Sequence, residues 1–144
     1  MVQLAARGVI EFTCEGNPPE EYHVAFQRPG LYVDQAGQLG VRRLHRARIH
    51  LHIDYPRFPP LLTWQTPIFH PNILPPERHG GVCIGSWSPS ESLADLCDRL
   101  ARMISYESFN VSDALHTEAA RWAEANDISE GDDVEGRLAR LSLH

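Results

Sequence analysis

The stretch IFHPNILPPERHGGVCIGSWSPS, residues 68–90, combines a His-Pro-Asn tripeptide with a cysteine that lies among β-forming residues behind two glycines. Only the residues VCI stand between these glycines and the loop GSWSPS, so Cys83 is expected in a short extended segment between loops. Such segments usually run over the protein surface. Three interpretations of Cys83 follow: a buried packing residue, a metal ligand, or a nucleophile that Asn72 assists.

A nucleophilic thiol needs open approach, and the flanking glycines leave Cys83 uncrowded. A thioester on this cysteine would pass to an amine through a tetrahedral intermediate, whose oxyanion needs a neutral donor such as the amide of Asn72. Pro71 stiffens the turn around His70, which favours a structural hydrogen-bonding role for that histidine. A cysteine hydrolase that pairs Cys83 with His70 or His79 stays an alternative, although no orienting third residue is evident.

Length and charge limit the possible classes of protein. The 144 residues fit one domain, 1–144, that can bury a core without disulfides or metal. The net charge of -6 argues against nucleic acid or an anionic membrane as the main partner. Three cysteines without a Cys-x-x-Cys pair predict neither a disulfide scaffold nor a zinc ribbon. With no membrane span or signal-peptide pattern either, a cytoplasmic protein is expected.

The first half of the chain alternates in the manner of β-strands. In GVIEFTCEG, Ile10, Phe12 and Cys14 share the predicted core face. YHVAFQ alternates likewise and completes a hairpin across GNPPEE. Residues 47–53 predict a half-exposed antiparallel strand, and a proline-rich connector then leads to a short strand within LLTW.

The second half of the chain changes to helical spacing. Apolar residues after Ser90 predict a helix that Ser90 caps and that carries Cys97 on its apolar stripe. SDALHTEAARWAEAN predicts a second helix capped by Ser112, and the acidic segment 126–144 ends in a short helix or a loose tail. Strands followed by helices predict an α+β domain, an antiparallel β-meander with helices packed on one face.

His50 and His52 share the polar face of the strand at 47–53. Two histidines at this spacing can hold a metal, but no cysteine or carboxylate pair accompanies them at ligand spacing. We therefore expect solvated side chains and no metal.

All thirteen basic residues are arginine, and the chain contains no lysine. An arginine-rich genome explains this composition. Because arginine stays protonated and cannot attack a thioester, a surface without lysine also suits a long-lived acyl-cysteine. A lysine in place of Arg78, in the loop just before Cys83, is expected to attack the thioester and form a self-conjugate if that loop borders the site.

Five of these segments, taken in order, resemble the sequence motifs of a known family. DYPRFPP, TPIFHPNI, GVCI, WSPSESL and DALHTEAA occur in the order found in ubiquitin-conjugating enzymes, and the chain is similar to a short bacterial member of that family over about residues 8–125. The resemblance implies the ubiquitin-conjugating-enzyme-like fold, with the usual N-terminal helix reduced or absent. The loop from Asn72 to Cys83 is longer than usual, and the segment from Cys83 to Trp87 is shorter.

The resemblance also implies roles for individual residues. Cys83 corresponds to the thioester-forming cysteine and Asn72 to the amide that supports the oxyanion or the active-site loop. Asp113 corresponds to a carboxylate that orients or deprotonates the incoming lysine. The residues expected to support the site structurally are His70, Pro71 and Trp87.

The implied partners are a ubiquitin-like modifier, an adenylating activating enzyme and target proteins. The activating enzyme uses ATP, and this chain needs no cofactor. Arg57 stands where RING-binding members commonly carry an apolar residue, which argues against a RING ligase partner. Bacterial proteins of this kind are associated with conjugation operons, often in antiphage defence. The alternative is a non-catalytic adaptor of the same fold, although such variants lack the cysteine that this chain retains.

Overall fold

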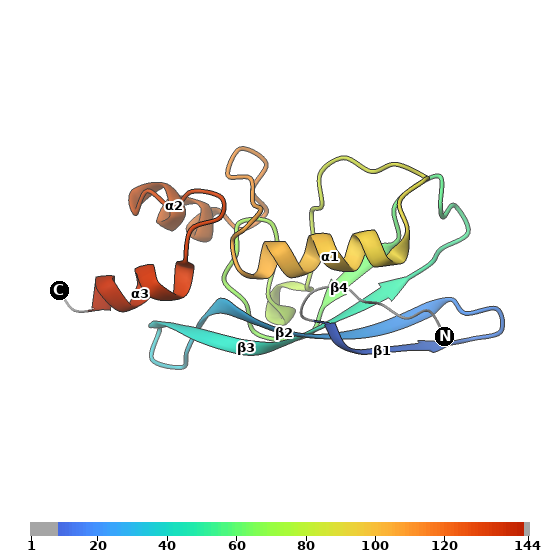
Figure 1. Ribbon diagram of the computed structural model, residues 1–144, viewed down its shortest axis with the longest axis horizontal. Helices are drawn as coiled ribbons and strands as arrows, with labels where there is room; N and C mark the ends of the chain where they lie inside the picture. Colours follow the sequence, from blue (N-terminus) through green and yellow to red (C-terminus); the bar gives the residue numbers. More distant parts are fainter. Residues whose placement is uncertain (1–8, 143–144) are drawn as a thin grey trace.

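The computed structural model describes residues 9–142 as an antiparallel sheet with helices on one side (Figure 1). The four strands follow one another in the order β1-β2-β3-β4, which confirms the predicted α+β meander. The expectation about the N-terminal helix falls on residues 1–8, outside the described residues. The elements are β1 (Val9–Glu15), β2 (Glu21–Val33), β3 (Leu39–His50), β4 (Leu61–Trp64), a 3-10 turn (Pro76–Arg78), α1 (Leu93–Ile104), α2 (Thr117–Ala125) and α3 (Val134–Ser142).

The β1–β2 hairpin forms as predicted, but only part of the predicted core face of β1 is buried. Phe12 is buried, whereas Ile10 is 57% exposed and Cys14 is also exposed. The pairing shifts register between Val9 and Glu11, which removes Ile10 from the alternation. The β1–β2 turn extends beyond the start of α1 (Figure 1), so this helix does not cover the turn.

Strand β3 is longer at its start than its apolar pattern predicts. It begins at Leu39, eight residues before the alternation becomes visible, and pairs with β2 from Val33↔Leu39 to Glu21↔His50. Cross-strand pairing stabilises this arginine-rich half of the strand although its own side chains give no strand signal. The predicted end at Ile53 is wrong, because β3 ends at His50 and Ile53 is 97% exposed.

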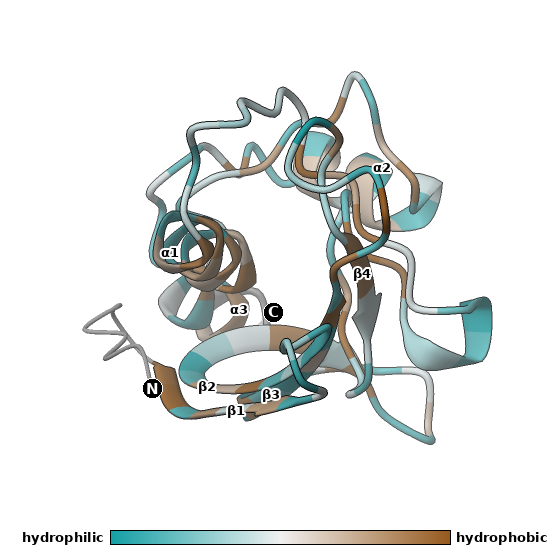
Figure 2. Cartoon of the chain, turned by 90° about the vertical axis from the view of Figure 1, so that its right-hand side faces the viewer, coloured by the Kyte–Doolittle hydropathy of each residue, from teal (hydrophilic) through white to brown (hydrophobic). Residues whose placement is uncertain are grey.

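The main core lies between the sheet and α1. The apolar face of α1 turns toward the sheet (Figure 2) and buries Cys97 as predicted. This burial raises the pKa of the Cys97 thiol to about 12. A second cluster joins β2 to the C-terminal helices; its buried members are Leu31, Phe69, Tyr106, Ala119, Ala123, Ile128 and Val134. The packed unit therefore extends past residue 125 into the acidic segment.

Both predicted helix caps are wrong. Helix α1 is capped by Ser92 in a capping box with Asp95, two residues after Ser90. Helix α2 is capped by His116, whose Nδ1 accepts a hydrogen bond from the Ala119 N–H at 3.1 Å. The chain before α2 stays non-helical because the N–H groups of Leu115 and His116 donate to the Pro71 carbonyl. Among residues 9–142, no helix has the length and apolar character needed to cross a membrane.

Candidate active site

The structure places Cys83 beside the His-Pro-Asn tripeptide. The backbone N–H of Cys83 donates to the Asn72 carbonyl at 2.9 Å, and a bridge between Ile73 and Val82 aligns the two segments. The Cys83 side chain is half-buried. It borders a cavity of about 270 Å³ whose other lining residues are Asn72, Ile84, Gly85, Arg99, Met103, Ser108, Phe109, Asn110, Asp113 and Glu130. Of the three cysteines, Cys83 alone lines this cavity.

The Asn72 side chain joins the tripeptide to the loop between α1 and α2. It is only 3% exposed. Its Oδ1 accepts from the Asn110 N–H at 2.8 Å, and its Nδ2 donates to the Asn110 carbonyl at 2.8 Å. The same Nδ2 lies 3.5 Å from the Asp113 carbonyl. The amide therefore holds this loop against the segment that carries Cys83.

His70 and Pro71 complete the attachment of this loop to the tripeptide. His70 is fully buried, and its Nδ1 accepts from the Asn72 N–H at 3.0 Å. Burial lowers the pKa of His70 to about 3, so its ring is neutral near pH 7. The Pro71 carbonyl accepts from the N–H groups of Leu115 and His116 at 2.9 and 3.0 Å. These contacts fix the loop at the start of α2 and explain why the helix cannot begin at Ser112.

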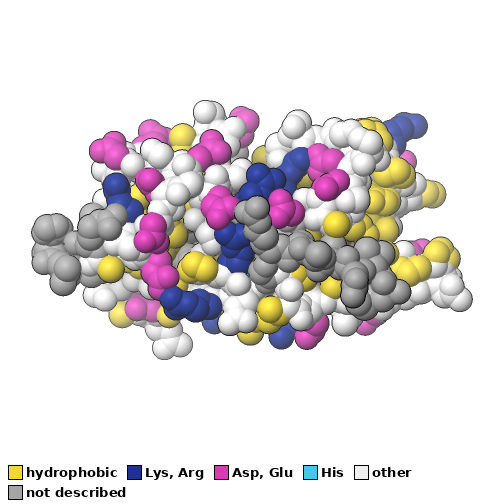
Figure 3. All heavy atoms as spheres, in the orientation of Figure 1, with side chains coloured by type: hydrophobic (Ala, Val, Ile, Leu, Met, Phe, Trp, Pro, Cys, Tyr) yellow, Lys and Arg dark blue, Asp and Glu magenta, His cyan; other side chains and the backbone are white. Residues whose placement is uncertain are grey.

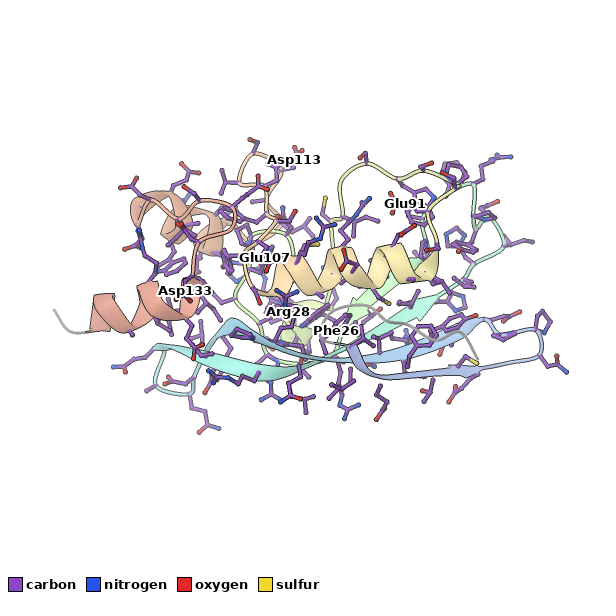
Figure 4. The ribbon with its side chains drawn as sticks, in the orientation of Figure 1. Phe26, Arg28, Glu91, Glu107, Asp113 and Asp133 are labelled. Carbon is purple, nitrogen blue, oxygen red and sulfur yellow. The ribbon has the colours of Figure 1, made fainter. Side chains whose placement is uncertain are left out.

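Asp113 lies on that same loop, and Figure 4 shows it at the outer edge of the molecule. Asp113 is exposed and lines the cavity together with Cys83 and Asn72. The structure thus brings together the three residues to which the sequence assigned chemistry. The arrangement offers a thiol, an amide and a carboxylate around one open space.

Trp87 holds the segment after Cys83 from the other side. Its Nε1 donates to the Pro56 carbonyl at 2.9 Å, and its ring centre lies 6.2 Å from that of Tyr55. Arg57, in the same connector, is exposed, and its guanidinium carbon lies 5.4 Å from the centre of the Phe58 ring.

Apolar side chains gather at the end of the molecule that carries this connector and the start of α1 (Figure 3). The exposed apolar residues there are Ile53, Phe58 and Leu61, at 97%, 52% and 59% exposure. We call these three residues the connector patch.

Sequence reasoning missed Arg99. This residue lies on α1, where only the apolar stripe attracted attention, and its guanidinium reaches the cavity and the chain after Cys83. Its partners are largely backbone carbonyls, which every residue carries. The residue types therefore give no signal for these contacts.

The predicted histidine pair does not act as a unit. Both His52 ring nitrogens are occupied locally, Nε2 at 2.7 Å from the Pro59 carbonyl and Nδ1 accepting from the Asp54 N–H at 3.1 Å. His50 instead lies 3.3 Å from Glu21. Across the outer face of the hairpin, ligand atoms of Glu15, Glu21 and His23 lie within 4.8 Å of one another. Glu15 is exposed and the other two are half-buried, and the ion pairs that these residues form also explain the group.

Comparisons with known proteins agree with this fold and motif order. Residues 41–132 match the family described as "Ubiquitin-conjugating enzyme". Ubiquitin-conjugating enzyme E2 16 of Schizosaccharomyces pombe is 35% identical over 83 residues, 55% of this chain and 49% of that protein. SUMO-conjugating enzyme UBC9 of Caenorhabditis elegans is 30% identical over 82 residues, 53% of this chain and 46% of that protein.

Among solved structures, ubiquitin-conjugating enzyme Pex4p of H. polymorpha, in complex with the soluble domain of Pex22p, is similar in fold. Its TM-score is 0.64 at 15% identity, over 84% of this chain and 75% of that one. The matched part of this chain spans about half the length of each of the two curated relatives. The family match covers well over half of the present sequence, including the tripeptide and Cys83. The chain therefore belongs to the ubiquitin-conjugating enzyme family.

Proposed function

We propose that this chain is a conjugating transferase that carries a ubiquitin-like modifier on Cys83. The Cys83 thiolate attacks the activated C-terminal carbonyl held by an activating enzyme, a C–S bond forms, and the activating enzyme's thiol leaves. A target amine then attacks the new thioester, the C–S bond breaks, an amide forms, and the amine loses a proton. The observation that supports this proposal is the shared cavity of Cys83, Asn72 and Asp113.

In this proposal Asn72 holds the acceptor side of the cavity. Both ends of its amide are engaged by Asn110, so its first effect is to fix the loop that carries Asp113. The Nδ2 contact to the Asp113 carbonyl is long, at 3.5 Å, and leaves one N–H weakly engaged. That N–H is the donor available to the oxyanion of the tetrahedral intermediate.

Asp113 is proposed to orient the amine and accept its proton. An exposed carboxylate on the cavity rim attracts the ammonium form of a lysine and stabilises the charge that develops during attack. His70 is unsuited to this work because it is buried, its Nδ1 already accepts a hydrogen bond, and it does not line the cavity. His79 does not line the cavity either, so the geometry gives no support to a cysteine hydrolase.

The partners follow from the proposed chemistry: a ubiquitin-like modifier, an adenylating activating enzyme that consumes ATP, and target proteins. This chain needs no cofactor for acyl transfer between thiol and amine. The charge of Arg57, beside the connector patch, argues against a RING ligase. We place the protein in the cytoplasm, in a bacterial conjugation pathway of the type associated with antiphage defence.

The test is a charging assay with ATP and a panel of ubiquitin-like modifiers, each with its activating enzyme. The wild-type chain should form an adduct that thiol reductants cleave. Cys83→Ser should form at most a thiol-resistant ester, whereas Cys14→Ala and Cys97→Ala should still become charged. An undiminished thiol-sensitive adduct on Cys83→Ser would exclude the assignment. Binding of a modifier without any adduct would instead indicate the adaptor alternative.

A further inference from the structure

The loop that follows Cys83 is held by one side chain of α1. Arg99 Nη1 donates to the carbonyl of Ile84 at 3.0 Å and to the carbonyl of Ser86 at 2.8 Å. Its Nη2 forms an ion pair with Glu91, which lies just before the start of α1 (Figure 4). The Arg99 and Glu91 side chains are 21% and 19% exposed, so this ion pair is largely removed from water.

The loop has no regular structure, and besides Arg99 it is held at Trp87, whose Nε1 donates to the Pro56 carbonyl. Residues 83–88 belong to no helix or strand. Gly85 has a φ of +79°, a conformation that favours glycine. Ile84 and Ser86 stand on either side of this turn, and their carbonyls converge on a single nitrogen of Arg99. The guanidinium therefore replaces the backbone partners that a sheet would supply.

We propose that Arg99 is a positioning residue for Cys83, and that Glu91 holds Arg99 in place. The inference rests on the proposed thioester function of Cys83. By fixing residues 84–86, Arg99 sets the cavity wall next to the sulfur, against which the modifier's C-terminal segment must lie. A planar guanidinium with five N–H groups can serve two carbonyls and a carboxylate at once, which an ammonium or a neutral amide cannot reproduce in this geometry.

A matched control lies one turn along the same helix. Arg102 forms an ion pair with Asp98 at 3.2 Å, and both side chains are well exposed, at 44% and 39%. Exposed pairs of this kind contribute little to stability. Arg102→Gln therefore removes an arginine and an ion pair from α1 without touching the loop after Cys83.

The first experiment needs neither modifier nor activating enzyme. NMR order parameters of the Ile84, Gly85 and Ser86 amides should be near the rigid value in the wild type and fall below about 0.6 in Arg99→Gln. Arg102→Gln should leave them unchanged. Glu91→Gln, which keeps the Arg99 side chain, should lower them less and provides a second variant if Arg99→Gln fails to fold. Unchanged order parameters in a folded Arg99→Gln would overturn the proposal. If Arg99→Gln does not fold, unchanged order parameters in Glu91→Gln would overturn it.

The second experiment measures single-turnover discharge of the charged protein to free lysine. Arg99→Gln should slow discharge at least about tenfold, because bonds between a charged donor and the carbonyls of Ile84 and Ser86 are lost. Arg102→Gln should match the wild type. In Arg99→Ala, added N-ethylguanidinium should restore part of the rate and of the loop order, whereas ethylammonium should not.

The two experiments separate the possible failures. A mobile loop with an unchanged discharge rate would overturn the positioning role of Arg99. A lack of rescue by N-ethylguanidinium would also count against it, since loss of helix stability alone would explain the defect. If the wild-type chain forms no thioester, the proposed function fails, while the order parameters still decide whether Arg99 holds the loop.

Discussion

The side-chain amide of Asn72 is bonded at both ends to the backbone of one residue, Asn110: Oδ1 accepts its N–H and Nδ2 donates to its carbonyl, each at 2.8 Å. The two residues are 38 positions apart in the chain. Through this pair, the loop of Asp113 is joined to the strand-like segment of Cys83. The donor proposed for the reaction and the attachment of the acceptor loop are thus the same chemical group.

We predict that Asn72→Ala becomes charged with modifier but discharges slowly. Loss of one oxyanion donor costs about 2.7–4 kcal/mol of barrier, which corresponds to a rate loss of about 10²–10³. The Asn110 backbone groups also lose their partners, which loosens the loop. The measurement is single-turnover discharge to free lysine beside the charging end point. A discharge rate equal to that of the wild type would show that Asn72 takes no part in transfer.

Asp113→Asn should slow discharge most strongly near neutral pH. The acceptor amine is then almost wholly protonated, since the pKa of a free lysine is about 10.4, and it needs a group that accepts the proton. As the pH approaches that value, the variant and wild-type rates should converge. Rates are measured across pH 7–10 with the thioester preformed. A loss that is uniform over this range would indicate positioning of the amine without proton transfer.

Acid should destabilise the fold through three buried histidines, His45, His70 and His116, whose pKa values burial lowers. Burial lowers the pKa of His70 from 6.5 to about 3 and that of His45 from 6.5 to about 4. Between pH 6.5 and about 4 the unfolded chain holds these protons and the folded chain does not. The free energy of unfolding is therefore highest above pH 6.5 and falls as the pH drops. Each histidine contributes a slope of up to about 1.4 kcal/mol per pH unit.

Urea unfolding at pH 7, 6 and 5 measures this dependence on pH. His45→Phe keeps a ring of similar size and removes one of these titrating groups. Its slope between pH 6 and pH 5 should be less steep than that of the wild type. An unchanged slope in this variant would mean that His45 takes up its proton in the folded state.

A lysine introduced into the cavity should capture the modifier from Cys83. Ser108 lines the Cys83 cavity, whereas Arg78 lines a separate one with Val33 and His116. Ser108→Lys should therefore accumulate an isopeptide-linked self-conjugate, because proximity raises its effective concentration. Arg78→Lys, which the sequence placed near the site, should not. Peptide mapping after prolonged charging locates the modifier in each variant. A conjugate on the introduced lysine of Arg78→Lys, with none in Ser108→Lys, would show that the Arg78 loop and not Ser108 borders the site.

The fold was largely predictable because its strongest signals are periodic or are short motifs. The β1–β2 hairpin and the apolar face of α1 follow from patterns of side chains along single segments. The first half of β3 could not be found in this way, since its strand state depends on pairing with β2. Cys14 illustrates the same limit: alternation places it on the core face of β1, but it is exposed because burial depends on the elements packed over the sheet.

The proximity of Asn72 and Cys83 was predictable from the motif, but the connections around them were not. Asn110, the Pro71 carbonyl and Arg99 act through backbone N–H and C=O groups that every sequence possesses. Such contacts have no residue-type signature. The start of α2 was misplaced for this reason, since Pro71 holds the chain at Leu115 and His116 and thereby delays the helix.

The order of the strands has a consequence for the time course of folding. Each strand pairs with its neighbour in sequence, so the sheet is built from local contacts and should form early. The cavity walls come from α1 and the loops around it. Hydrogen bonds of the Asn72 side chain join these loops across 38 to 41 residues, so the cavity closes a longer section of chain. We therefore expect the surroundings of Cys83 to form after the sheet. A refolding chain should pass through a state that has native strands but in which the loop carrying Asp113 is not yet formed.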